Sequence, residues 1–179
     1  MFKTNKSDVI LLSSVTLVFL FVCARAVNLN FTHDEAYSFL NIKQFWYAQF
    51  LCNANSHWLN SGAMKIVSLF GLESAWGLRW FSLACAGGLL TLAYGFIRKL
   101  EDYRLQFLAF AILCLNPFVL DYFVLARGYV SGMFFECLAF YFFLKHKKEG
   151  SNKNAFVALT SAGLAAIANF NFFYFFCAF

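Results

Sequence analysis

The chain has 179 residues, of which 61% are hydrophobic, 21% are aromatic and only 13% are charged. This composition excludes a soluble globular domain, because much of the surface of such a domain must be polar. The net charge of +5 does not indicate nucleic-acid binding, since the basic residues fall in short clusters between apolar runs. We therefore expect an all-α polytopic membrane protein. Its expected partner is the lipid bilayer, and we expect no nucleic-acid partner.

Five apolar runs reach or approach the length of about 20 residues that a helix needs to cross the hydrocarbon core. In chain order they cover residues 9–27, 80–97, 105–119, 129–144 and 155–176. The pattern Ala24-Arg25-Ala26 also resembles the cleavage site of a secretory signal. The length of the first run and the four runs that follow it favour a membrane anchor, so we expect about five transmembrane helices.

The distribution of Lys and Arg predicts the orientation of these helices. Nine of the 14 basic residues lie before the first run, between the second and third runs, or between the fourth and fifth. The positive-inside rule places these segments and the N-terminus in the cytoplasm. The long loop of residues 28–79 then lies on the outer side. The same side carries the remaining bases, which are Arg25, Lys43, Lys65, Arg79 and Arg127.

The outer loop contains two segments that are typical of helices lying in the membrane interface. Residues 36–51 place polar side chains on one arc of a helical wheel and aromatic side chains on the remainder. Residues 58–72 form the second segment, and Gly71 is expected to end that helix. We therefore expect two interfacial helices in the loop rather than a soluble domain.

Two adjacent acids, Asp34 and Glu35, follow the first apolar run directly. A carboxylate at the water-exposed boundary of the membrane can act as a general base toward a hydroxyl group. The alternative is that both acids cap the first interfacial helix, because Asp and Glu favour helix N-termini. The residues alone leave both interpretations open.

Three of the outer bases are candidates for binding a phosphate. Arg79 and Arg127 lie at the outer ends of the second and fourth runs, and Lys65 lies on the second interfacial helix. Guanidinium groups at this depth suit bidentate contact with a phosphate. The alternative is that the arginines extend to the interface or pair with Glu73 and Asp121.

Three segments resemble a known family. Residues 32–39 (THDEAYSF), 55–83 and 115–129 are similar, in this order and spacing, to the N-terminal part of GT-C glycosyltransferases. The most similar group is that of the protein O-mannosyltransferases and aminoarabinose transferases (glycosyltransferase 39, RgtA/B/C/D-like). The resemblance implies an inverting enzyme, and the closer likeness to bacterial members favours the bacterial inner membrane over the alternative of an endoplasmic reticulum membrane. Such an enzyme takes a sugar from a polyprenyl-phosphate carrier, its donor substrate, on the periplasmic side.

The resemblance also implies roles for individual residues. Asp34 would activate the acceptor hydroxyl, and Glu35 would support it. Arg79 matches the family arginine that helps to hold the donor region. Arg127 and Tyr129 match an R-x-Y segment and would bind the carrier phosphate.

The second matching segment contains both a likeness and departures. His57, Leu59 and Asn60 resemble the H-x-L-N segment of the bacterial members, which adds His57 and Asn60 to the candidate substrate-binding residues. Trp58 stands where many members have Pro. Some relatives bind a metal through an acid in this segment, and its absence here speaks against a divalent metal. We therefore expect no metal site and no cofactor other than the lipid-linked sugar.

The last residues, 169–179, lie inside an apolar run, and we expect the chain to be the N-terminal part of a longer enzyme. On this expectation the chain would be inactive alone. The alternative functions are a non-catalytic or transporter-like membrane module and an assembly subunit. A transporter should show Gly or Pro interruptions at mid-membrane, whereas Pro117 lies near an outer end.

Overall fold

The computed structural model describes residues 6–44 and 57–179, and this part of the chain is helical with no strand. By length and composition, two of its helices can cross a membrane, or three if α6 and α7 form one bent span. The expected class of an all-α membrane protein is thus confirmed. The helices are α1 (Lys6–Asn28), α2 (His33–Gln44), α3 (Trp58–Leu69), α4 (Ala75–Leu78), α5 (Trp80–Ile97), α6 (Tyr103–Cys114), α7 (Pro117–Val124), α8 (Gly128–Glu149), α9 (Asn152–Ala168) and α10 (Phe173–Ala178), with a 3-10 turn at Phe170–Phe172.

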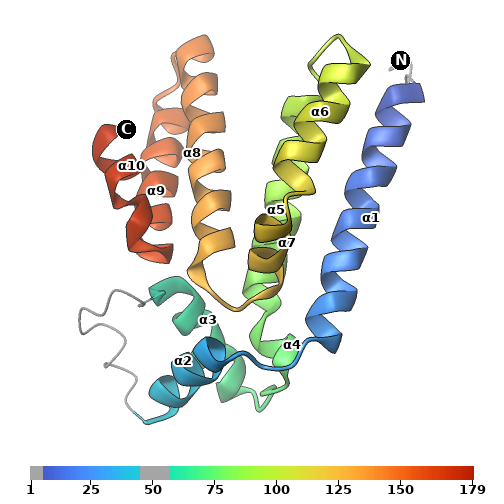
Figure 1. Ribbon diagram of the computed structural model, residues 1–179. Coiled ribbons are helices and arrows are strands. Elements are labelled where there is room, and N and C mark those ends of the chain that lie inside the picture. Colours follow the sequence, from blue (N-terminus) through green and yellow to red (C-terminus); the bar gives the residue numbers. More distant parts are fainter. Residues whose placement is uncertain (1–5, 45–56) are drawn as a thin grey trace.

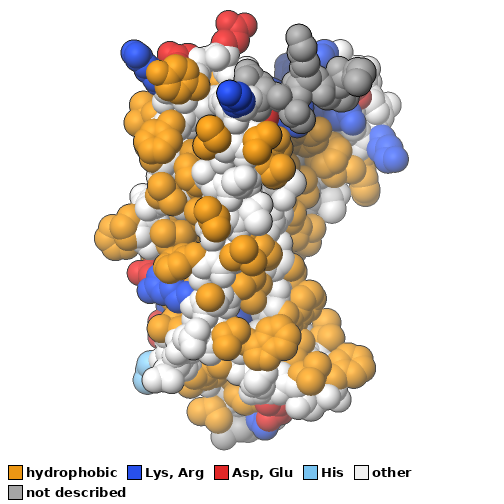
Figure 2. Space-filling model, turned by 90° about the vertical axis from the view of Figure 1, so that its right-hand side faces the viewer, with side chains coloured by type: hydrophobic (Ala, Val, Ile, Leu, Met, Phe, Trp, Pro, Cys, Tyr) orange, Lys and Arg blue, Asp and Glu red, His pale blue; other side chains and the backbone are white. Residues whose placement is uncertain are grey.

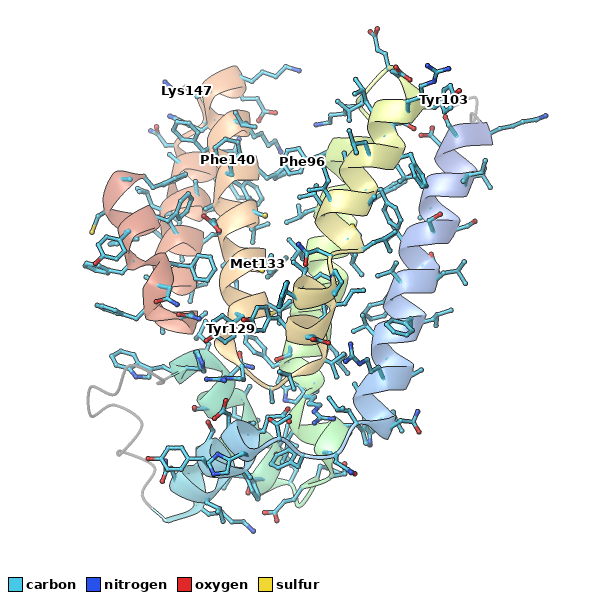
Figure 3. All side chains as sticks on the ribbon, in the orientation of Figure 1. Phe96, Tyr103, Tyr129, Met133, Phe140 and Lys147 are labelled. Carbon is cyan, nitrogen blue, oxygen red and sulfur yellow. The ribbon has the colours of Figure 1, made fainter. Side chains whose placement is uncertain are left out.

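The long helices stand side by side, and α2, α3 and α4 lie across one end of the bundle (Figure 1). We call this end the α2–α4 end. The start of α1 and the α5–α6 and α8–α9 connections lie at the opposite end (Figure 1), where most of the predicted cytoplasmic bases lie in or within a few residues of these segments. Lys147 and Tyr129 mark the two ends of α8 (Figure 3).

One face of α1 packs into the bundle and the other is apolar and exposed. Its buried residues recur every three or four positions, as one face of a helix requires. Residues such as Ile10 and Leu17 are about two-thirds exposed. Figure 2 shows that hydrophobic side chains cover most of this side of the molecule, as expected of a surface in contact with lipid. The buried stripe consists of Leu11, Val15, Val18, Val22 and Ala26.

Helices α8 and α9 pack along each other through small side chains. Small residues let two backbones approach closely, which is a common way of joining helices in membranes. At Gly132 the space that a Cβ atom would need is taken by the ring of Phe172, 2.4 Å from the ideal Cβ position. The buried small residues are Gly128, Ser131, Gly132 and Ala139 on α8, and Ala158, Ser161, Ala162, Ala165 and Ala168 on α9.

Two of the predicted spans are divided in the structure. The run 105–119 breaks between α6 and α7, which meet at 52°. Pro117 restricts the preceding Asn116 to extended backbone, and the Asn116 side chain accepts a hydrogen bond from the Phe118 N–H. The run 155–176 breaks at Asn169, which is extended and accepts a hydrogen bond from the Asn171 N–H. At each break an asparagine side chain thus caps the helical segment that follows.

The two expected interfacial helices correspond to α2 and α3, although residues 45–51 of the first prediction lie outside the described residues. Gly71 ends α3 as predicted: it adopts a φ of +71° in the left-handed region. The N–H groups of Gly71 and Leu72 donate to the carbonyls of Ser68 and Val67. A small apolar cluster of Ile42, Met64, Leu78 and Ala126 joins α2, α3 and α4 to the α7–α8 connection.

Candidate functional site

The first candidate acid, Glu35, caps the helix on which it lies. The Thr32 N–H donates to Glu35 Oε2 at 3.0 Å, and the Glu35 N–H donates to Thr32 Oγ1 at 3.4 Å. This reciprocal arrangement is a capping box, which satisfies two N–H groups at the start of a helix. The capping interpretation therefore holds for Glu35, and the signal T-x-x-E is visible in the sequence.

Glu35 also forms a buried ion pair with Arg79, and both side chains are fully buried. Arg79 Nε donates to Glu35 Oε1 at 2.8 Å, and Nη2 donates to Oε2 at 2.7 Å. The remaining N–H groups of Arg79 donate to three backbone carbonyls just after or at the end of α1. These are the carbonyls of Ala26, Leu29 and Asn30, at 2.8, 2.8 and 3.1 Å.

This geometry changes the role expected for Arg79. An arginine has five N–H donors, and Arg79 directs all five at the protein. No donor is left for a phosphate, so in this structure Arg79 binds the end of α1 and the start of α2 rather than a donor substrate. Glu35 is equally occupied, because its Oε1 also accepts the Ala126 N–H at 2.7 Å. We call these two side chains the closed pair.

The Glu35 carboxyl group is ionised at neutral pH. Burial alone would raise the pKa of Glu35, but hydrogen bonds from Arg79, Ala126 and Thr32 and the charge of Arg79 lower it overall. Because Ala126 lies in the α7–α8 connection, the closed pair joins α1, α2 and α5 to the residues directly before α8. It thereby brings Asp34 and Arg127 together.

Asp34 and Arg127 form a second ion pair, which is open to solvent. Arg127 Nη1 donates to Asp34 Oδ2, while its Nε and Nη2 make no hydrogen bond to a residue in the described part of the chain. The Asp34 side chain is 53% exposed and that of Arg127 is 16% exposed. We call these two residues the open pair. It has free hydrogen-bonding capacity that the closed pair lacks.

Tyr129 connects the open pair to an aromatic group at the start of α8. The Arg127 guanidinium lies over the Tyr129 ring, 5.3 Å from its centroid. Tyr122 stacks on the same ring at 4.4 Å, and His57 contacts it at 5.2 Å. The structure thus places Asp34, Arg127, Tyr129 and His57, which were predicted from separate segments, in one cluster.

His57 is 5% exposed, and neither ring nitrogen makes a hydrogen bond of normal geometry with a described residue. Burial and the positive charge of Arg127 lower its pKa to about 4, against the smaller opposing effects of the Ala168 carbonyl and Asp34. The imidazole is therefore neutral at neutral pH. A neutral ring offers no positive charge to a phosphate.

Asn60 joins three helices and does not reach the open pair by any hydrogen bond between described residues. Its Nδ2 donates to Ser82 Oγ at 2.7 Å, and its Oδ1 accepts from Ser131 Oγ at 2.9 Å. All three residues are buried. The network connects α3, α5 and α8, and nothing in the sequence pattern indicated Ser82 or Ser131 as the partners.

Lys65 lies on α3, where its ammonium donates to the Ile42 carbonyl of α2 at 3.4 Å. No contact between described residues links it to the open pair. This hydrogen bond joins α3 to α2.

The alternative partners expected for the two arginines are wrong. Glu73 accepts from Lys43 at 2.7 Å, and Asp121 pairs with Arg25 at 2.6 Å. The predicted partners, Glu73 and Asp121, are near in sequence to Arg79 and Arg127. The actual partners are 44 and 93 residues away in the chain.

The described residues contain no group of three or more His, Cys, Asp or Glu side chains that could hold a metal ion. Comparison of the chain with protein-family models, with curated proteins and with solved structures found no match.

Proposed function

We propose that this protein is a membrane glycosyltransferase that moves a sugar from a polyprenyl-phosphate carrier to an acceptor hydroxyl. The observation that carries the proposal is the open pair at the end of a membrane bundle: a half-exposed carboxylate beside an arginine that uses one of its nitrogens toward the described residues. A lipid-linked phosphate has its charge at this depth. The resemblance of the three sequence segments to GT-C enzymes supports the same reaction.

In the proposed reaction, Asp34 accepts the proton of the acceptor hydroxyl. The hydroxyl oxygen forms a new bond to the anomeric carbon, and the bond from that carbon to the phosphate oxygen breaks. The electron pair leaves with the polyprenyl phosphate, whose charge Arg127 stabilises. General-base assistance is worth about 10²–10⁴-fold in rate, and a cation on the leaving group adds to this.

The closed pair has a positioning role in this proposal. Glu35 and Arg79 touch no substrate but fix the start of α2 against the α7–α8 connection. A displacement of about 1 Å between a base and its substrate can cost about 100-fold in rate. Glu35 therefore supports Asp34 by holding it and Arg127 in reach of each other.

The topology of the proposed enzyme follows from the same assignment. We place the α2–α4 end in the periplasm of a bacterial inner membrane and the N-terminus in the cytoplasm. In addition to α1, α5 and the bent pair α6–α7, we propose that α8 and α9 cross the membrane, which gives five spans. The Lys and Arg residues at the end of the bundle opposite α2 support this orientation.

The test is sugar transfer by the full-length protein carrying Asp34→Asn, measured in membranes with polyprenyl-phosphate-linked mannose, glucose and arabinose as donors. We expect transfer to fall about 100-fold or more while the amount of inserted protein is unchanged. Asp121→Asn is the matched control. Asp121 is 52% exposed and is also paired with an arginine. Retention of transfer by the Asp34 variant would contradict the proposed base.

A second candidate function is a non-catalytic membrane module. It is favoured by one observation: each acid at the α2–α4 end, Asp34, Glu35, Glu73 and Asp121, has a basic partner among the described residues. In such a module the open pair would only fasten α2 to α8. The wild-type protein would then neither transfer a sugar nor bind polyprenyl phosphate.

A further inference from the structure

Three buried side-chain nitrogens have no partner at full hydrogen-bond geometry in the described part of the chain, although the Ala168 carbonyl lies near enough to His57 to oppose the fall in its pKa. They are Nδ1 and Nε2 of His57 and Nδ2 of Asn169. The two residues are 5% and 4% exposed. Buried polar groups are almost always hydrogen-bonded, and an unpaired one costs about 1–3 kcal/mol. Within the described part of the chain, nitrogens at the start of α3 and at the end of α9 are thus available to a ligand.

His57 and Ala168, the residue before Asn169, meet at one place, the start of α8. A Cβ atom added to Gly128 would lie 1.8 Å from the carbonyl oxygen of Ala168 and 2.7 Å from His57 Nδ1. Asn169 is the residue that follows Ala168 at the end of α9. The end of α9, the residue before α3 and the start of α8 thus meet at Gly128, whose lack of a side chain permits the approach.

The chemistry of the two groups suits a neutral hydroxyl. A neutral imidazole offers one N–H donor and one nitrogen acceptor, and a primary amide offers two N–H donors. A hydroxyl group both donates and accepts, so it can satisfy the imidazole and the amide together. A phosphate, which only accepts, would leave the acceptor nitrogen of His57 unpaired.

The position relative to the open pair indicates which hydroxyl. Arg127 lies over the Tyr129 ring at 5.3 Å, and His57 contacts the same ring at 5.2 Å. A group bound at His57 is therefore about one ring away from a phosphate held by Arg127. In a polyprenyl-phosphate sugar, the sugar is attached directly to the phosphate.

We propose that His57 and Asn169 form a sugar-hydroxyl subsite of the donor, in which they hydrogen-bond to hydroxyl groups of the sugar whose phosphate Arg127 binds. This inference rests on the proposed function and deepens it. It predicts that the two residues distinguish a glycosylated carrier from the bare carrier, because only the glycosylated carrier has hydroxyls at that place.

The experiment compares dissociation constants for two kinds of probe. These are bare polyprenyl phosphate and polyprenyl phosphate carrying mannose, glucose or arabinose, each bound to the full-length protein in nanodiscs. In His57→Phe and Asn169→Leu we expect the bare carrier to bind within about threefold of wild type. The best glycosylated carrier should lose roughly tenfold in affinity, as expected for one or two lost hydrogen bonds.

Two further variants test whether the loss of affinity is specific to hydrogen bonding at these two residues. His57→Gln keeps a neutral donor and acceptor and should retain part of the preference for the glycosylated carrier. Asn154→Leu is the matched control. Asn154 is a buried asparagine at the other end of α9, bonded to Glu149 at 3.0 Å, and its substitution should leave the preference unchanged.

Each other outcome has a defined meaning. Equal affinities of the two kinds of carrier in wild type, or an unchanged preference in both His57→Phe and Asn169→Leu, would overturn the subsite and assign an ordered water as the partner. Equal losses for both kinds of carrier in all three subsite variants would overturn it as well. If wild type binds neither kind of carrier, the proposed function itself fails.

Discussion

The closed pair and the open pair lie next to each other but differ in how many of their hydrogen-bond donors and acceptors contact described residues. In the closed pair, all five donors of Arg79 and both carboxylate oxygens of Glu35 are used within the protein. In the open pair, Arg127 uses one nitrogen toward residues 6–44 and 57–179, and Asp34 is half exposed. Adjacent acids thus have different roles because successive helical residues point about 100° apart.

The comparison extends to the neighbours of each pair. The backbone groups that contact the closed pair are hydrogen-bonded to it, so these contacts stabilise the fold. The open pair is linked through Tyr129 to His57, whose ring nitrogens lack a partner of full hydrogen-bond geometry among the described residues. Proteins retain the cost of such groups where a ligand must be bound, because the groups are then free to contact it.

The largest effect on stability is expected from Arg79→Ala, which leaves the buried Glu35 carboxylate without its charged partner. Removing one partner of a buried ion pair costs about 3–5 kcal/mol in the free energy of unfolding. The measurement is unfolding by a denaturing detergent in mixed micelles. Arg25→Ala, at a solvent-exposed pair, is the control and should cost at most about 1 kcal/mol. Equal losses of unfolding free energy in the two variants would contradict the distinction between a buried and a solvent-exposed ion pair.

A second effect concerns His57 and the dependence of stability on pH. In the unfolded chain a histidine has a pKa near 6.5, whereas burial lowers the folded value to about 4. The unfolded state therefore binds more protons between these values, and stability should fall as pH decreases from 6.5 to 4. The loss amounts to roughly 3 kcal/mol at the lower limit. His57→Gln, which does not titrate, should reduce this slope. An unchanged slope would show that the ring is not buried in a neutral form.

The smallest of these effects is expected at Gly128, where α3, α8 and α9 meet beside the open pair. Gly128→Ala places a Cβ atom 1.8 Å from the Ala168 carbonyl, so the backbone of α9 must move. Overpacking of this kind costs about 1–3 kcal/mol in unfolding free energy. Gly95→Ala is the control, because nothing lies within 4 Å of its added Cβ, and it should be neutral or slightly stabilising. A Gly128 variant as stable as the Gly95 variant would mean that the helices do not meet as described.

Much of the fold could be predicted from the sequence. The run 80–97 coincides with α5, and the run 9–27 lies within α1, because uninterrupted apolar residues leave a helix no local competitor. The breaks before Pro117 and at Asn169 were missed. The first had a visible signal in Asn-Pro, whereas the second depends on one side-chain hydrogen bond that hydropathy does not register.

The site was predictable in its composition but not in its pairing. The acids, arginines, Tyr129 and His57 could be identified as candidates, and Thr32 with Glu35 gave a capping signal. Which base contacts which acid depends on the tertiary arrangement, and proximity in sequence indicated the wrong partners. Neither the buried Asn60 network nor the unpaired amide of Asn169 has a sequence signature, because both depend on residues from other helices.

The affinity for bare polyprenyl phosphate is the most direct test of the open pair as a binding site. It should be measured on the full-length protein for Arg127→Ala and, as a matched control, Arg25→Ala, since both arginines are paired with exposed aspartates at the α2–α4 end. We expect the dissociation constant to rise about 10- to 100-fold for Arg127→Ala, the loss of a charged hydrogen-bonding contact, and to stay within about threefold for Arg25→Ala. Equal affinities of the two variants and wild type would contradict the account.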